Sequence, residues 1–119
     1  MKIGEVSKEL DIPSATLRYY EQIGLLENIK KKNGIREYQE EDIDRIKFIM
    51  CMKQAGFSLE AIVEFVKLGK NSKNGENKRL EMLLKQKEIL IEEIKKKEDT
   101  LDFLNYKIDI YKEKVSNKK

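Results

Sequence analysis

The residues best suited to chemistry stand in one short run, Thr-Leu-Arg-Tyr-Tyr-Glu at positions 16–21. Arginine is the most frequent reader of guanine edges, and it also binds phosphate through paired hydrogen bonds. A neighbouring tyrosine can donate its hydroxyl group to a phosphate. Arg18 and Tyr19 are therefore candidate contacts to nucleic acid, although an isolated pair of this kind is more often ordinary surface.

A second group of cations follows in a predicted β-hairpin over residues 28–38. Its turn is Asn33-Gly34, the strongest two-residue hairpin signal, and the residues after the turn alternate as a returning strand. Lysines on a hairpin edge can serve only to discourage aggregation, or they can bind the phosphates that flank a groove. Because the hairpin follows closely after the run at 16–21, phosphate binding is the favoured interpretation of its lysines. The candidate contacts in the two segments are Arg18, Tyr19, Lys30, Lys31, Lys32, Arg36 and Tyr38.

The elements around the run predict how it is presented. Apolar residues share one face of a short helix over residues 3–10. A second helix over residues 15–22 follows, with Ser14 as its predicted N-cap and Pro13 before it. Two short helices joined by a tight turn make a helix-turn-helix, whose second helix enters the major groove of DNA. The hairpin would then be the wing of a winged helix-turn-helix.

Two further helices are predicted before a polar segment. A helix over residues 40–54 opens on three acidic residues and is apolar nearly all the way round, which predicts a central buried helix. Ser58 caps a fourth helix that ends at about residue 68. The predicted organisation is a winged helix-turn-helix domain at residues 1–70, an asparagine-rich linker at 71–77 and a long helix at 78–119.

The long helix carries a heptad repeat. Its a and d positions are apolar or aromatic apart from Lys87 and Lys97, which weaken the seam and could fix its register. A helix this polar is marginal in water when alone, so it needs a partner. The fold class is therefore mainly α, with a coiled-coil dimerisation helix. The predicted dimerisation residues are Leu80, Leu83, Leu90, Ile94, Leu101, Leu104, Ile108 and Tyr111.

Composition excludes several classes of protein. Lysine and arginine number 25 against 22 aspartates and glutamates, and residues 1–70 hold 12 of each sign, so any positive charge that binds nucleic acid must be local. Without histidine, a glycine-rich phosphate loop or a nucleophile–base arrangement, we expect no enzyme, no cofactor and no metal site. No run is long and apolar enough to span a membrane, and the single cysteine fits a reducing cytoplasm.

Two interpretations of the role of Cys51 remain open. A lone cysteine on an apolar helix is most often a small buried hydrophobe. It could instead react covalently with an electrophile or an oxidant, because the chain offers no second cysteine or histidine to complete a metal site.

Five segments, in their order and spacing, resemble the MerR (mercury-resistance-regulator) family of bacterial transcription regulators. They are residues 3–6 (Ile-Gly-Glu-Val), the run at 16–21, 24–26 (Gly-Leu-Leu), 34–38 (Gly-Ile-Arg-Glu-Tyr) and 56–62 (Gly-Phe-Ser-Leu-Glu-Ala-Ile), and the likeness covers nearly the whole chain. The resemblance implies a winged helix-turn-helix domain and a homodimer joined by an antiparallel coiled coil. It also implies a pseudo-palindromic operator of double-stranded DNA in a promoter with an overlong spacer, which the dimer bends and untwists so that RNA polymerase engages both promoter elements.

The resemblance also assigns residues. It places helix contacts to DNA on Thr16, Arg18 and Tyr19, and wing contacts on Arg36 and Tyr38. The segment around Cys51 is similar to that of the branch that responds to aldehydes or nitrosative stress through one cysteine, which implies a thiol switch.

Two other functions remain open. A regulator of the same build could sense an apolar small molecule between the coiled coil and the DNA-binding domain, without a thiol switch. Alternatively, the chain could be a coiled-coil interaction module whose helix-turn-helix binds protein. A thiol titration of the native protein discriminates the first alternative, and a gel shift with the upstream DNA discriminates the second.

Overall fold

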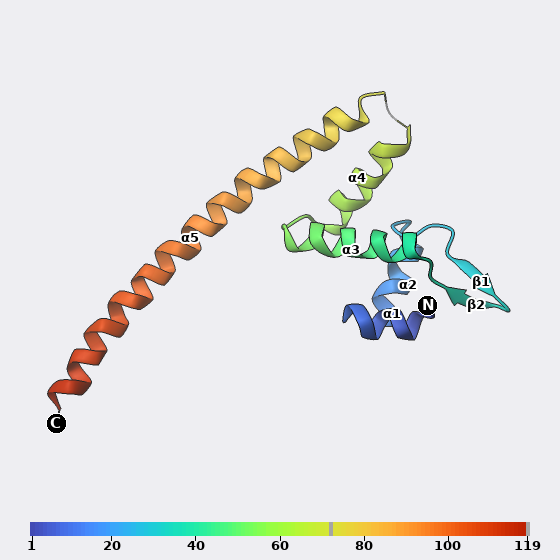
Figure 1. Ribbon diagram of the computed structural model, residues 1–119. Coiled ribbons are helices and arrows are strands. Elements are labelled where there is room, and N and C mark those ends of the chain that lie inside the picture. Colours follow the sequence, from blue (N-terminus) through green and yellow to red (C-terminus); the bar gives the residue numbers. More distant parts are fainter. Residues whose placement is uncertain (72, 119) are drawn as a thin grey trace. The chain divides into compact units, whose positions relative to one another are not determined.

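The computed structural model of the protein describes residues 1–71 and 73–118, except for the side chains of residues 70 and 71. The chain forms two compact units, Met1–Met82 and Leu83–Lys119. Figure 1 shows the succession of elements along the chain: four helices and a hairpin, then a single long helix. No helix among the described residues is long and apolar enough to cross a membrane.

Helices α1 (Ile3–Leu10) and α2 (Ser14–Gln22) form the helix-turn-helix. The turn between them bends at Asp11, whose φ of 52° lies in the left-handed region. The Ser7 hydroxyl donates a hydrogen bond of 2.6 Å to the carbonyl of Ile12 and so ties the turn to α1. The predicted pair of short helices with a tight turn is confirmed.

The start of α2 differs from the prediction by one position. Ser14 is the first helical residue, and Pro13 occupies the N-cap position, with no side-chain hydrogen bond to cap the helix. The prediction that Ser14 caps α2 is therefore wrong. A proline is tolerated at the start of a helix because its missing N–H would have no partner within the helix there. Its ring also fixes φ near the helical value, here at −58°.

Strands β1 (Lys30–Lys32) and β2 (Ile35–Glu37) form a two-stranded antiparallel sheet, which is the predicted wing. The turn residues Asn33 and Gly34 both have positive φ, 55° and 78°, as a tight hairpin turn of this kind requires. The residues that face each other across the ladder are Lys30 and Glu37, Lys31 and Arg36, and Lys32 and Ile35.

Helices α3 (Glu40–Gln54) and α4 (Leu59–Asn71) complete the scaffold of the first unit. Each begins at a side-chain cap. Asp42 accepts a hydrogen bond of 2.8 Å from the backbone N–H of Gln39, and the Ser58 hydroxyl accepts one of 3.1 Å from the N–H of Ala61. The predicted bounds of α3 and the predicted Ser58 cap are both confirmed.

One hydrophobic core joins the elements of the first unit. Its buried residues are Val6, Ile12, Leu17, Tyr20, Leu25, Leu26, Tyr38, Ile46, Ile49, Met52, Ile62, Phe65 and Val66. Helix α3 contributes only three of them, Ile46, Ile49 and Met52, so it is buried along one side and not all round as predicted. The apolar side chains on its other sides are half-buried or exposed.

Helix α5 (Gly75–Asn117) is continuous. Both helices that border the predicted linker extend into it, because α4 ends at Asn71 and not at about residue 68, and α5 begins at Gly75 and not at residue 78. Packing accounts for the early start of α5, since Gly75 is buried and Met82 packs against the core of the first unit.

Candidate nucleic-acid interface

Helix α2 separates its side chains into an inner and an outer face. Leu17 and Tyr20, three residues apart, are only 0% and 2% exposed. Helical periodicity therefore turns Arg18 and Tyr19 outward, and both are exposed. Thr16 is half-buried. Among the described residues Arg18 forms no hydrogen bond or ion pair, so its guanidinium can bind a ligand without breaking an internal bond.

The lysines of the wing lie on both of its faces. All three are exposed, and in the part of the chain that the structure describes none of them forms an ion pair. Side chains of a strand alternate between faces, so Lys31 shares a face with its cross-strand partner Arg36, whereas Lys30 and Lys32 share the other. Since Arg36 reaches α2, the lysine on the side of α2 is Lys31.

An ion pair joins the wing to α2. The Arg36 Nε donates a hydrogen bond of 2.6 Å to the Glu21 carboxylate, and the two side chains are 31% and 19% exposed. The carboxylate also offsets the repulsion between Arg36 and Lys31, which stand directly opposite each other. Arg36, predicted as a DNA contact, is thus first an anchor of the wing.

Glu21 is a residue of the site that the sequence reasoning did not single out. It ends the run at 16–21, directly after the two tyrosines, and its charge is opposite to that of Arg36 in the returning strand. The opposite charges could have indicated an ion pair. The two residues are 15 positions apart, however, and only the folded hairpin brings them together.

Tyr38, which was predicted to contact DNA from the wing, lies in the core. Its side chain is 2% exposed, because the chain turns inward after β2. The backbone N–H of Tyr38 donates to the Met1 carbonyl at 2.6 Å, and its carbonyl accepts a hydrogen bond of 2.9 Å from the Met1 ammonium. The two backbone bonds hold the residue against the start of the chain.

The Tyr38 hydroxyl is buried and has no hydrogen-bond partner among the described residues. Burial, followed by the nearby negative charge of Glu21, raises the pKa of Tyr38 above its ordinary value of 10.0. The hydroxyl is therefore protonated and neutral at physiological pH.

Cys51 is exposed. Its side chain lies away from the side of α3 that buries Ile49 and Met52. The interpretation as a buried hydrophobe is therefore contradicted in the single chain, and the thiol is accessible to a reagent in solution.

Helix α5 presents most of its apolar residues to solvent. Of the predicted dimerisation residues only Leu90 is half-buried, and the others are exposed, from 41% at Leu83 to 58% at Tyr111. The exposed ones are Leu80, Leu83, Ile94, Leu101, Leu104, Ile108 and Tyr111. A long exposed stripe of this kind, apolar except for two lysines, is typical of an interaction surface on a helix.

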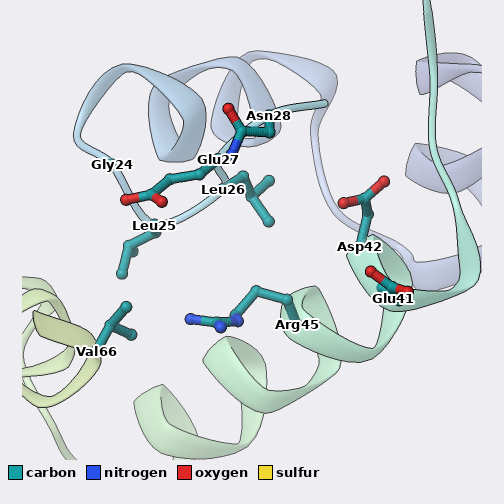
Figure 2. Close-up of a pocket in the computed structure, with 9 residues that line it drawn as sticks. All are labelled: Gly24, Leu25, Leu26, Glu27, Asn28, Glu41, Asp42, Arg45 and Val66. Carbon is teal, nitrogen blue, oxygen red and sulfur yellow. The ribbon is translucent and has the colours of Figure 1, made fainter. Parts of the chain in front are cut away.

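A polar cavity of about 220 Å³ lies beside the loop that follows α2. Figure 2 shows the Arg45 guanidinium reaching into it toward Val66, with the Glu27 carboxylate on the opposite wall and Asp42 at the start of α3. All of its lining residues belong to the first unit, so it is not the place between the coiled coil and the DNA-binding domain where the alternative hypothesis puts an apolar effector. No group of three histidine, cysteine or acidic residues in the described chain could hold a metal ion.

Two family models match the chain. The model for "MerR HTH family regulatory protein" matches residues 1–68, which hold the helix-turn-helix, the wing, α3 and most of α4. The model for "MerR, DNA binding" matches residues 43–105, from α3 far into α5.

Individual relatives extend the likeness over most of the chain. The HTH-type transcriptional regulator AdhR of Bacillus subtilis (strain 168) is 43% identical over 93 residues, which cover 77% of this chain and 66% of AdhR, just under two thirds of its length. The uncharacterized HTH-type transcriptional regulator YyaN of the same organism is 41% identical over 135 aligned positions, which cover 98% of this chain and 96% of YyaN.

A solved structure adds a likeness in three dimensions. The crystal structure of HiNmlR, a MerR family regulator lacking the sensor domain and bound to promoter DNA, superimposes with a TM-score of 0.82 at 26% sequence identity. The match covers 94% of this chain and 90% of that one.

Proposed function

Because this chain belongs to the MerR family of helix-turn-helix regulatory proteins, we propose that two copies of it, joined along α5, bind a pseudo-palindromic operator and distort the promoter around it. The chain is a DNA-binding transcription regulator and not an enzyme. As a regulator of bacterial promoters it acts in the cytoplasm, where the DNA and RNA polymerase are.

The observation that best supports the proposed DNA-binding mode is that Arg18 and Tyr19 point outward from α2. A base-reading arginine needs an unoccupied guanidinium on a helix that can enter the major groove, and Arg18 meets both requirements. Tyr19 and the half-buried Thr16 offer hydroxyl groups to the adjacent phosphates. The likeness to a regulator whose crystal structure contains promoter DNA supports the same mode.

The wing adds affinity without sequence preference. Its lysines, Lys30, Lys31 and Lys32, are exposed and suited to bind phosphates on either side of the groove. Arg36 contributes by holding the wing against Glu21, so that these cations keep a fixed place relative to α2.

A binding assay with DNA from upstream of the protein's own gene tests the DNA-binding mode. A lost base contact costs about 1–3 kcal/mol, so Arg18→Ala should lower the affinity at least about fivefold. Arg45→Ala, which removes an exposed arginine from α3, is the matched control and should leave the affinity unchanged. Wild-type affinity of the Arg18→Ala protein would overturn the assignment, and the absence of any gel shift by the wild type would favour the protein-interaction module.

Salt dependence separates the wing from the recognition helix. The affinity falls with salt, and each phosphate contact that is removed should make the slope of log affinity against log salt less steep by about 0.9. Lys31→Ala should therefore change that slope on any DNA sequence, whereas Arg18→Ala should relax the preference for the operator.

Distortion of the promoter is the proposed output. Bending a site of operator length by the angles seen in regulators costs about 1–6 kcal/mol, which the contacts of two α2 helices and two wings would offset. Footprinting of the spacer tests this point: bases hyperreactive to a cleavage reagent should appear between the two half-sites. A uniform footprint, with bases as unreactive as in free DNA, would contradict distortion.

The proposed switch is the thiol of Cys51. It is exposed and can form a covalent bond with an aldehyde or be oxidised without prior unfolding of the first unit.

A further inference from the structure

We propose that Arg79 and Gly69 form a clamp that holds the first turns of α5 against α4, and that the spacing of the two α2 helices on DNA depends on this clamp. The second part of the inference rests on the proposed dimeric function, whereas the clamp itself does not.

The clamp is built from Arg79, near the start of α5, and the backbone of α4. The Arg79 Nε donates a hydrogen bond of 2.8 Å to the carbonyl of Phe65, and its Nη2 donates one of 3.3 Å to the carbonyl of Val66. The guanidinium carbon lies 4.7 Å from the centroid of the Phe65 ring, which adds a cation–π contact. One half-buried side chain thus contacts α4 in three ways.

Gly69 supplies the space in which the guanidinium lies. A Cβ atom placed on Gly69 would overlap the guanidinium group of Arg79, with Nη2, Cζ and Nη1 as the nearest atoms. Gly69 is an ordinary helical residue of α4 without a positive φ, so its conformation does not require glycine. Alanine would favour the helix, and the presence of glycine is explained by the need to admit Arg79.

Only an arginine can make this set of contacts. Its planar group donates from several nitrogens at fixed angles while it stacks on a ring, whereas a lysine ammonium is a compact, strongly hydrated charge. The clamp lies just before the boundary between the compact units at Met82 and Leu83. Helix α5 is continuous across this boundary, so its clamped first turns and the heptad stripe belong to one helix.

A double-mutant cycle measured by urea unfolding tests the clamp without DNA. In the wild-type background Gly69→Ala should lower the unfolding midpoint, because the new methyl group expels the guanidinium. In the Arg79→Ala background the same change should raise the midpoint, because only the gain in helix propensity remains. A rise in both backgrounds would overturn the clamp.

Distances between spin labels test the attachment of α5 to α4. Labels at Glu60→Cys and Glu92→Cys in a Cys51→Ser background, diluted with unlabelled protein, should give a narrow distance distribution. Arg79→Ala should broaden that distribution at least about twofold, since the start of α5 is then no longer held against α4. Lys78→Ala, which removes an exposed cation one residue earlier, should leave it unchanged. An equally narrow distribution for Arg79→Ala would overturn the inference.

Operators with altered spacing test the link to DNA. Wild-type protein should prefer one half-site spacing, and Arg79→Ala should lower the affinity for that spacing about tenfold while changing the others less than about twofold. A structural defect alone would lower all affinities equally and would overturn the link. If the wild type bound no DNA, the proposed function would fail, and the distance distributions would still decide whether the clamp exists.

Discussion

An exposed thiol at Cys51 can react in the native state, which makes its role testable at a single atom. We expect one thiol per chain to titrate without denaturant, and faster than in a model peptide if the site has evolved to react. Because the chain has one cysteine, a thiol reagent modifies only this position. Cys51→Ser should retain operator affinity and lose the transcriptional response to an aldehyde or an oxidant. A normal response of that variant would refute the thiol switch and leave DNA binding intact.

For the buried hydroxyl of Tyr38 we expect that its removal stabilises the folded protein. An unsatisfied buried polar group costs about 1–3 kcal/mol, so Tyr38→Phe should raise the free energy of unfolding by about 1 kcal/mol. Operator affinity should not change, because the side chain is buried. Chemical denaturation of both proteins measures the difference. A loss of stability would mean that the hydroxyl has a partner in solution.

The same residue predicts a dependence on pH. The pKa of Tyr38 is raised in the folded state above its ordinary 10.0, so between the two values the folded protein binds more protons than the unfolded chain. The contribution of this group is therefore intact below pH 10, and stability falls as the pH rises above it. The advantage of Tyr38→Phe over the wild type should grow in that range. Tyr106→Phe, at an exposed position, is the control and should show no such growth.

At the scale of elements, the pair between Glu21 and Arg36 decides whether the wing acts with α2. A partly exposed charged hydrogen bond is worth about 1 kcal/mol after screening by solvent. Glu21→Gln should therefore raise hydrogen exchange at the backbone of residues 30–37 and weaken operator binding about fivefold. Glu9→Gln removes the same charge from the exposed side of α1 and should do neither. Unchanged exchange in the wing would show that the hairpin is held by other contacts.

The turns show how far local sequence predicts these elements. Asn33 and Gly34 predicted the hairpin correctly because both tolerate the positive φ that the turn needs. The start of α2 was misplaced by one residue, since Pro13 can precede a helix as easily as a serine can cap one. Helix ends depend on such small differences, whereas the existence of each helix follows from its longer apolar pattern.

For the whole molecule, the seam along α5 predicts the state of assembly. Ile94→Asp places a charge at an a position in the middle of the exposed stripe and should convert the dimer to monomers in sedimentation experiments at micromolar concentration. The same variant should lose operator binding, because two linked half-site contacts become one. Ile89→Asp makes the same chemical change at a similarly exposed position outside the seam and should remain dimeric. A monomeric wild type would contradict the proposed assembly.

The sequence by itself determined the order of the elements, the outward turn of Arg18 and Tyr19, and the heptad stripe on α5. All of these follow from periodicities of two to seven residues, which the chain carries locally. The tertiary structure decided which side chains are surface and which are core. Tyr38 is buried, Cys51 is exposed, and Arg36 is bound to Glu21. The contact of Arg79 with α4 is of the same kind. Each depends on residues far apart in the chain, and no local pattern records how far a distant segment will cover or pair with a side chain.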